Sequence, residues 1–359
     1  MMFELLRTRD MPKRSGRGCS HVRRVLTGIS PSGMPHLGNY AGAIRPAIAA
    51  SQQPGVEGFF FLADYHALIT TVDPARLRRF TLQTAAAWLA AGLDPEKVIF
   101  YRQSDIPEIL ELTWLLTCVT PKGLLNRAHA HKAAVDKNTA EGRNADAGVS
   151  MGMFMYPVLM AADILTFRAD SVPVGRDQLQ HIEMARDIAA RFNHLYGEHF
   201  VLPEASIDES VAILPGLDGR KMSKSYGNTI PLFAQATKLK KLIFSVVTDS
   251  SAATQPKDSA RSTLFQLYQT FVTPEEAAAM RGAFAGGISW SEVKEAVFDR
   301  IDAELAPMRT RYEELLADAA GIEQRLQEGA VKARSVTTPF LSRLREAVGV
   351  GRLVAGITG

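Results

Sequence analysis

The spacing of apolar residues changes along the chain between short runs and helical repeats. Short runs rich in apolar or β-branched residues predict buried strands at 22–28, 57–64, 97–101 and 171–174. Apolar residues recur at helical spacing over 37–48, 76–91 and 179–192, each after one of these runs. Because strands and helices alternate, we expect an α/β fold with a doubly wound, Rossmann-like parallel sheet.

Two other parts of the chain are helical without strands. Residues 107–133 carry an apolar stripe, which predicts a helical insertion at about 105–168. Within it, the polar stretch 134–148 is expected to be a mobile loop, and Pro157 to lie in the first turn of a helix. The tail keeps helical spacing and predicts a helical bundle. The expected division is a flexible basic extension (1–22), a Rossmann-like domain (23–237) and an all-helical C-terminal domain (238–359).

Composition narrows the functional classes. The chain has 359 residues, of which 46% are hydrophobic, which is enough to bury a large core. No apolar run reaches the roughly 18 residues of a membrane helix, so no membrane partner is expected. Two cysteines, Cys19 and Cys118, cannot build a four-cysteine metal site, and we expect no metal-ligating residues and a reducing cytoplasm. The positive charge is concentrated in residues 1–24, so bulk charge does not indicate a nucleic-acid partner.

A turn rich in glycine, proline and serine follows the first strand. It leads into a helix that begins near His36 and Gly38. Unpaired N–H groups and the positive end of the helix dipole favour an anion at such a position, and His36 and Asn39 can donate hydrogen bonds to phosphate. An ordinary βα unit with a glycine turn explains this stretch equally well.

A carboxylate, Asp163, stands in the almost wholly apolar segment 151–165. Burying a carboxylate without a hydrogen-bond donor is costly, so Asp163 is expected to have a partner. A structural Arg or Lys, or an exposed edge, is the common explanation for such a residue. The alternative is an N–H or O–H group of a ligand that reaches Asp163 in an apolar pocket.

Two further turns carry candidate chemistry. Gly175 and Asp177 open the helix after the fourth strand, where Asp177 either caps the helix or bonds a ribose hydroxyl. Lys221 and Lys224 lie on a glycine-rich loop at 219–227. Lysines on loops are usually only solvated, but on a flexible loop they can neutralise a polyphosphate.

Several of these segments resemble one known family. The run His36-Leu37-Gly38-Asn39 and the run Lys221-Met222-Ser223-Lys224-Ser225 resemble the two signature motifs of class I aminoacyl-tRNA synthetases. The stretches 156–163 and 172–183 resemble the bacterial tryptophanyl branch of that family. The similarity extends from about Val25 to the C-terminus.

The resemblance implies roles for individual residues. It implies that the indole N–H of tryptophan binds Asp163, and that the tryptophan site as a whole contains Tyr156, Met160, Asp163, Val172, Val174 and Gln178. For ATP it implies Ser30, Pro31, Ser32, Gly38, Asn39, Gly175, Arg176, Asp177, Ile213, Lys221, Met222, Ser223, Lys224 and Ser225. The catalytic residues it implies are His36, Asn39, Lys221 and Lys224.

It also implies substrates and partners. The chain is expected to activate L-tryptophan with ATP and Mg²⁺ and then to esterify tRNA(Trp). Residues 238–359 are expected to bind the anticodon, and the helices at 107–133 to form a homodimer interface. Ser30 and Leu26 depart from the Gln and Phe that the family often has there. The alternatives are a tyrosyl-tRNA synthetase, a small-molecule nucleotidylyltransferase and an inactive RNA-binding paralogue.

Overall fold

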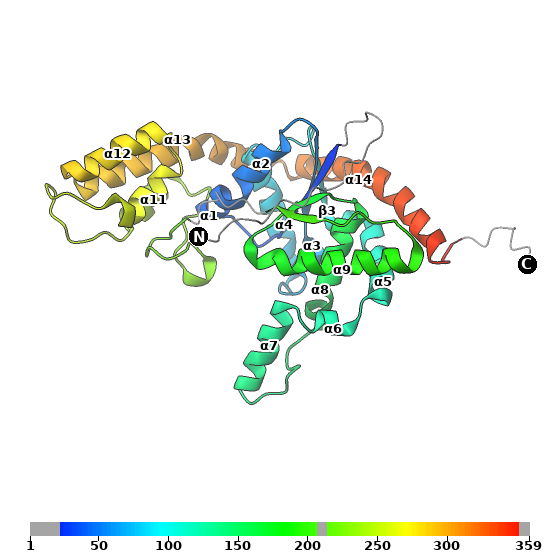
Figure 1. Ribbon diagram of the computed structural model, residues 1–359. Coiled ribbons are helices and arrows are strands. Elements are labelled where there is room, and N and C mark those ends of the chain that lie inside the picture. Colours follow the sequence, from blue (N-terminus) through cyan, green and yellow to red (C-terminus); the bar gives the residue numbers. More distant parts are fainter. Residues whose placement is uncertain (1–21, 207–213, 352–359) are drawn as a thin grey trace, which may run out of the picture.

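A five-stranded parallel sheet lies at the centre of the molecule (Figure 1). The computed structural model describes residues 22–206 and 214–351, without the side chain of Asp177, so nearly all of the predicted extension 1–22 and Ile213 lie outside it. The strand order is β3-β2-β1-β4-β5. The strands are β1 (Arg23–Ile29), β2 (Val56–Leu62), β3 (Ile99–Arg102), β4 (Ser171–Pro173) and β5 (Glu204–Ser206). The predicted α/β fold with a Rossmann-like parallel sheet is confirmed, with β5 as a strand that the sequence pattern did not indicate.

Helices surround this sheet and extend beyond it. Those that follow the strands directly are α1 (Leu37–Asn39), the π-helical turn η1 (Tyr40–Ile44), α2 (Arg45–Ser51), α3 (Asp64–Ala67), α4 (Pro74–Ala90), η2 (Gln103–Asp105), η3 (Arg176–Gln178) and α9 (Leu179–Tyr196). Between β3 and β4 come α5 (Pro107–Val119), α6 (Lys122–Leu125), α7 (His129–Ala140) and α8 (Met151–Thr166). The remaining ones are η4 (Lys224–Tyr226), α10 (Ala236–Phe244), η5 (Ser259–Arg261), α11 (Thr263–Gln269), α12 (Pro274–Gly286), α13 (Trp290–Ala317) and α14 (Ala319–Ala347).

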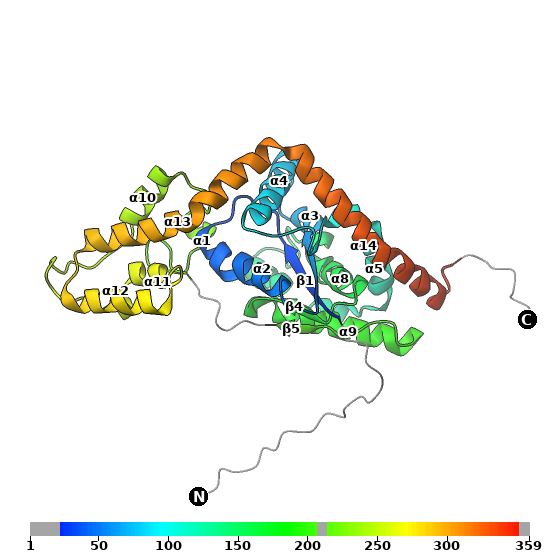
Figure 2. The same ribbon diagram turned by 90° about the horizontal axis from the view of Figure 1, so that it is seen from above.

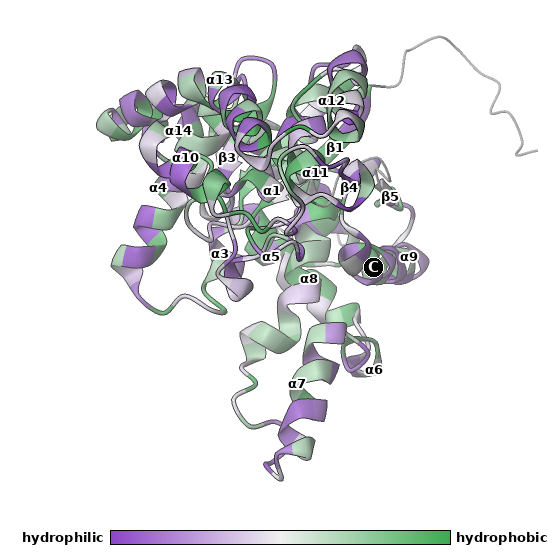
Figure 3. Cartoon of the chain, turned by 90° about the vertical axis from the view of Figure 1, so that its left-hand side faces the viewer, coloured by the Kyte–Doolittle hydropathy of each residue, from purple (hydrophilic) through white to green (hydrophobic). Residues whose placement is uncertain are grey.

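The segment between β3 and β4 differs from two local expectations. The stretch 134–148 is not a loop throughout, because α7 continues to Ala140. The buried side-chain amide of Asn138 donates to the carbonyl oxygens of Ala145 and Ala147, which folds the following turn back onto the helix. Pro157 does not lie in the first turn of α8, because the helix is capped by Ser150 and begins at Met151, which places Pro157 inside it. α7 projects away from the sheet and is largely hydrophilic (Figure 3).

The two faces of the sheet belong to two apolar cores. Alternate residues of β2 point to opposite faces, as the pleat requires, so Phe60 and Leu62 join one core and Phe59 and Phe61 the other. The first core continues through α2 and α4 into α10–α13. The second core includes α5, α8 and α9. Within the described ranges, none of the helices combines the length and the apolar character needed to cross a membrane.

The last long helix returns to the sheet. α14 packs along the edge strand β3, and Figure 2 shows it running from the end of α13 back across the molecule. Gly329 permits this approach, because a Cβ atom at that position would lie 1.7 Å from the carbonyl oxygen of Phe100. Covering an edge strand in this way keeps its backbone from pairing with another chain. The predicted boundary at 237/238 remains a prediction.

Candidate active site

The candidate residues gather at the carboxyl ends of the parallel strands. The loop that begins at Ser30 follows β1, and the turn at Gly175 follows β4. These two strands are neighbours, with Val25 paired to Ser171. β2 lies on one side of β1 and β4 on the other, so the strand order reverses direction between β1 and β4. Ligands of doubly wound sheets bind at such a switch point.

His36 caps the helix that follows β1. Its Nδ1 accepts a hydrogen bond from the backbone N–H of Asn39 at 3.3 Å, and the side chain of Asn39 accepts one from the backbone N–H of His36 at 3.1 Å. Because Nδ1 is the acceptor, the ring proton of the neutral imidazole is on Nε2. Burial, aided by the positive charge of Lys224, lowers the pKa of His36 from 6.5 to about 4. At neutral pH His36 is therefore an uncharged donor.

The lysine-bearing loop lies directly on this helix start. The N–H of Gly38 is 3.4 Å from Sδ of Met222, and Nζ of Lys224 donates to the backbone oxygen of Ser32 at 2.8 Å. Burial lowers the pKa of Lys224. A Cβ atom at position 38 would lie 3.0 Å from Nδ1 of His36 and 3.4 Å from Cβ of Met222, so this position is tightly packed between the two segments. Residues far apart in the sequence thus meet at one point.

Asn228 fixes the shape of that loop. Its Oδ1 accepts from the N–H of Ser223 at 2.9 Å, and its Nδ2 donates to Asp218 at 2.7 Å and to the carbonyl of Lys221 at 3.2 Å. Gly216 packs so closely on Asn228 that a Cβ atom would come within 2.4 Å. The backbone of the loop is thereby held while the side chains of Lys221, Lys224 and Ser225 remain exposed.

The backbone N–H groups at the helix start have protein partners. The N–H of Leu37 donates to the carbonyl of Ile230 at 2.9 Å, and that of Gly38 approaches Met222. The expectation of unpaired N–H groups for an anion is therefore wrong in this arrangement, because the segment after the lysine loop pairs with the helix start. A phosphate group here would rely on side chains.

The second part of the site is a group of apolar residues around Asp163, beside β4. Tyr156, Met160 and Asp163 share one face of α8, since they are four and three residues apart. Val172, which is buried on β4, and Val174 belong to the same apolar core as Met160. The residues predicted to surround the indole ring are thus brought together.

Asp163 is 1% exposed and has two protein donors. Nε2 of Gln103 lies 2.7 Å from one carboxylate oxygen, and Nε2 of His66 lies 2.8 Å from the other. Burial raises the pKa of Asp163, while His66 and Gln103 act to lower it. Among the residues that the structure describes, no Arg or Lys is bonded to this carboxylate. A carboxylate has about four acceptor positions, so these two bonds leave capacity for a ligand donor.

His66 and Gln103 were not identified from the sequence. Each follows a buried strand closely, Gln103 directly after β3 and His66 four residues after β2. The position of polar side chains after buried strands was the available signal. The N–H of Tyr65 also donates to Oε1 of Gln103, at 3.1 Å, so α3 and η2 form one support for Asp163.

A histidine also joins the two residues assigned to the α-ammonium group. His181, which is 4% exposed, has its Nε2 2.5 Å from the hydroxyl of Tyr156 and its Nδ1 2.9 Å from Oε1 of Gln178. Tyr156 and Gln178 therefore lie close together although they come from α8 and η3. The role of His181 was not predicted.

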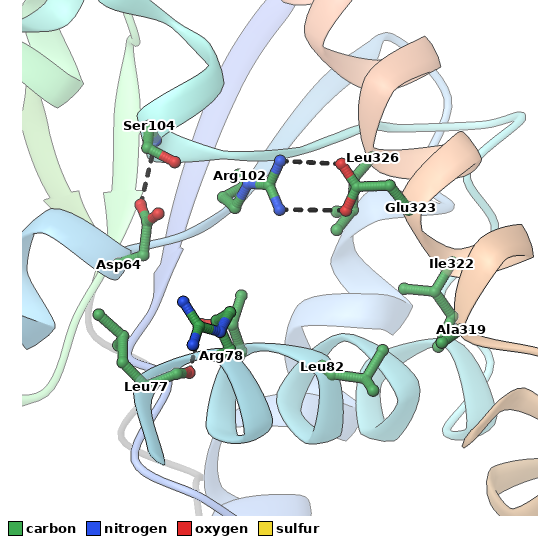
Figure 4. A pocket seen from close by; sticks show the side chains of 11 residues that line it. Asp64, Leu77, Arg78, Leu82, Arg102, Ser104, Ala319, Ile322, Glu323 and Leu326 are labelled. Atoms are coloured by element: carbon green, nitrogen blue, oxygen red, sulfur yellow. Dashed lines mark hydrogen bonds and ion pairs between the residues drawn. The ribbon is translucent and has the colours of Figure 1, made fainter. Parts of the chain in front are cut away.

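A cavity of about 320 Å³ lies on the other side of α3 and η2. Asp64, Arg78 and Arg102 face it, and Arg102 is bonded to Glu323 at its rim (Figure 4). None of its lining residues is among those predicted for ATP or tryptophan. The predicted site therefore lies at the switch point between β1 and β4 and not in this cavity.

Comparison with known proteins identifies the family of the chain. The sequence profile of "tRNA synthetases class I (W and Y)" matches residues 20–332. A tryptophan-tRNA ligase from Xanthomonas campestris pv. campestris is 65% identical over 329 residues, which cover 91% of this chain and 76% of that protein. One from Pseudomonas putida is 63% identical over 330 residues, 91% of this chain and 74% of that protein.

A solved structure shows the same fold. The tryptophanyl-tRNA synthetase from Campylobacter jejuni, complexed with ADP and tryptophan, superposes with a TM-score of 0.83 at 42% identity and covers 91% of this chain and 99% of that one. The chain therefore belongs to the class I tRNA synthetases of the tryptophan and tyrosine group. Within that group it falls in the tryptophan-tRNA ligase branch, as the sequence resemblance implied.

Proposed function

We propose that this chain activates L-tryptophan with ATP at the switch point of the sheet and then transfers it to tRNA(Trp). The observation that carries the proposal is the meeting of the helix start at His36, after β1, with the loop of Lys224. His66 and Gln103, the partners of Asp163, follow β2 and β3 at the same edge of the parallel sheet. One part of the site is cationic and adjustable. The other is apolar with a single buried carboxylate.

The proposed first step is attack of the tryptophan carboxylate on the α-phosphorus of ATP, which yields tryptophanyl-adenylate and pyrophosphate. The carboxylate is already ionised, so neither an enzyme nucleophile nor a strong general base is required. Catalysis then consists of alignment and charge stabilisation. His36 would donate from Nε2 to a phosphate oxygen, Asn39 would assist, and Lys221 and Lys224 would neutralise the leaving pyrophosphate.

The tryptophan pocket would select by one hydrogen bond. Asp163 would accept the indole N–H while Met160, Val172 and Val174 contact the ring. A side chain without that N–H, such as phenylalanine, would leave the buried acceptor less well satisfied. Tyr156 and Gln178, linked by His181, would bind the α-ammonium group.

The remaining nucleotide contacts come from the turns around the phosphates. The proposed residues are Ser30, Pro31, Ser32, Gly38, Gly175, Arg176, Asp177, Ile213, Met222, Ser223 and Ser225. Within the described residues no group of three or more His, Cys, Asp or Glu could hold a metal ion. Mg²⁺ would reach the site on the phosphate oxygens of ATP, as it commonly does.

The second step would be attack of a ribose hydroxyl of the terminal tRNA adenosine on the adenylate carbonyl, with the C-terminal helices binding the anticodon. The active form would be a homodimer in the cytoplasm. On α5, Leu110 is 43% and Trp114 is 67% exposed, and this apolar face supports α5 as part of the dimer interface.

Amino-acid-dependent exchange of pyrophosphate into ATP, without tRNA, tests the proposal. With all twenty amino acids assayed separately, tryptophan alone is expected to support exchange. Exchange with tyrosine would instead favour the tyrosyl assignment. No exchange with any amino acid in the presence of Mg²⁺ would contradict the proposal and favour a nucleotidylyltransferase or an inactive paralogue.

A further inference from the structure

The helix that carries His36 widens immediately after Asn39. Tyr40–Ile44 forms a π-helical turn between α1 and α2. Such turns are rare and are frequent at functional sites, because they place a side chain where a regular helix would not. The side chain placed here is that of Tyr40, which is 5% exposed.

Tyr40 reaches the long helix α13. Its hydroxyl donates to Oε1 of Glu304 at 2.7 Å. Burial and the neighbouring Glu304 raise the pKa of Tyr40, so the hydroxyl is a donor throughout the physiological pH range. Nη1 of Arg45 lies 3.5 Å from the same carboxylate, and the Arg45 guanidinium lies over the rings of both Tyr40 and Phe271. The segment that follows α11 and the helix α13 thereby hold the turn.

The same residue is tied to the active-site cap. The backbone N–H of Tyr40 donates to the carbonyl of His36 at 3.1 Å, directly after the reciprocal hydrogen bonds of His36 and Asn39. The position of the Tyr40 ring therefore fixes where the helix starts and where Nε2 of His36 points. The hydroxyl bond to Glu304 anchors that ring to a helix more than 250 residues further along the chain.

We propose that Tyr40 and Glu304 are positioning residues for the ATP site, which hold His36 and Asn39 in the orientation that binds the triphosphate. The inference deepens the proposed function and rests on it for the identity of the ligand. Neither residue touches the nucleotide. Their effect reaches it through the helix start.

Substitutions can separate positioning from packing. Tyr40→Phe keeps the ring and removes only the hydroxyl, and Glu304→Met removes the acceptor at similar volume. Glu304→Gln retains an oxygen acceptor. The matched control is Tyr312→Phe on the same helix α13, because the Tyr312 hydroxyl is buried without a hydrogen-bond partner among the described residues.

Binding of ATP alone, measured by equilibrium dialysis, and steady-state pyrophosphate exchange are the two readouts. We expect Tyr40→Phe and Glu304→Met each to weaken ATP binding and to lower kcat/KM for ATP about tenfold, the effect of one lost hydrogen bond to a charged group. The KM for tryptophan should not change. The double variant should be no worse than Glu304→Met, because that single variant already removes the bond to Tyr40 together with the contact to Arg45.

Two further comparisons complete the experiment. For Glu304→Gln, ATP binding and kcat/KM for ATP should stay within about threefold of the values of the unmodified chain, since a neutral hydrogen bond replaces a charge-assisted one. For Tyr312→Phe, both values should equal those of the unmodified chain. A fall in melting temperature for Tyr40→Phe with unchanged ATP binding and kcat/KM would show a structural role only and overturn the inference. If the unmodified chain binds ATP but shows no tryptophan-dependent exchange, the proposed function fails while the dialysis still decides the positioning role.

Discussion

Asp163→Asn is the substitution that separates recognition of the indole from the stability of the pocket. Gln103 donates to one oxygen of Asp163 at 2.7 Å, so the amide oxygen of the new Asn is expected to stay on that side. Its nitrogen then faces His66, whose Nε2 can accept once the ring proton moves to Nδ1. The local network remains bonded. We expect a loss of about 1–2 kcal/mol in the free energy of unfolding, the difference between charged and neutral hydrogen bonds.

The effect on tryptophan activation should be larger than this loss suggests. The indole N–H would lose a charged acceptor, which is worth about 1.5–3 kcal/mol. That range corresponds to a decrease of about 10- to 150-fold in kcat/KM for tryptophan. Phenylalanine has no N–H group, so its weak activity should not decrease. The ratio of kcat/KM for tryptophan to that for phenylalanine should fall by the same factor.

Pyrophosphate exchange with each amino acid measures this ratio directly. Glu108→Gln provides the control, because Glu108 is a buried carboxylate bonded to Arg334 and Thr338 on α14. That variant should lose stability without any change in the tryptophan-to-phenylalanine ratio. An unchanged ratio in Asp163→Asn, with the variant shown to be folded, would refute the assignment of Asp163 to the indole.

Three other predictions concern the helix packing, the cap and the loop. Gly329→Ala should destabilise the fold by about 3 kcal/mol or more in chemical denaturation, because the new Cβ atom would overlap a backbone oxygen of β3. Gly282→Ala is the control and should stabilise the fold slightly, because no atom lies within 4 Å of the new Cβ atom. The pKa of His36 is 6.5 in the unfolded chain but about 4 in the folded chain, so the unfolded chain takes up the proton first as the pH drops. The free energy of unfolding should therefore fall by up to about 3 kcal/mol between these two pH values. His36→Asn should remove that part of the pH dependence. Lys224→Met should lower kcat for pyrophosphate exchange about 10²-fold, because charge stabilisation of the leaving pyrophosphate is lost. An unchanged kcat with a raised KM for tryptophan would argue against the proposed role of Lys224 at the pyrophosphate.

The sheet could be predicted because its strands are buried on both faces. Phe59 and Phe60 point to opposite cores, so β2 has no polar alternation and its apolar run is unmistakable. β5 has only three residues, Glu204–Ser206, two of them exposed, and carries no such signal. The end of α7 was taken for a loop because its residues are polar, and only the buried amide of Asn138 shows why they are ordered into a helix and turn.

The site was predictable where its residues share a motif and not where they meet through the fold. Asp163 was singled out because a carboxylate in an apolar helix needs a donor, but the donors, His66 and Gln103, come from segments 97 and 60 residues away. Their contact depends on how α3 and η2 follow neighbouring strands. The bond between Tyr40 and Glu304 likewise joins two helices whose separation in the sequence gives no local signal.

The two halves of the site are stabilised in opposite ways. Asp163 is almost fully buried and already bonded by two donors, so the proposed tryptophan site around it would be ordered before any ligand enters, which favours discrimination. The ATP half is joined by a 3.4 Å contact to the sulfur of Met222 and by one exposed lysine on a backbone oxygen. The contact to Met222 is partly buried, whereas the bond of Lys224 is exposed, so phosphate oxygens can replace the bond of Lys224 at little cost. In the proposed function, the chain would thus combine a rigid site that selects the amino acid with exposed lysine side chains, on a loop whose backbone is held, that can follow the triphosphate as pyrophosphate leaves.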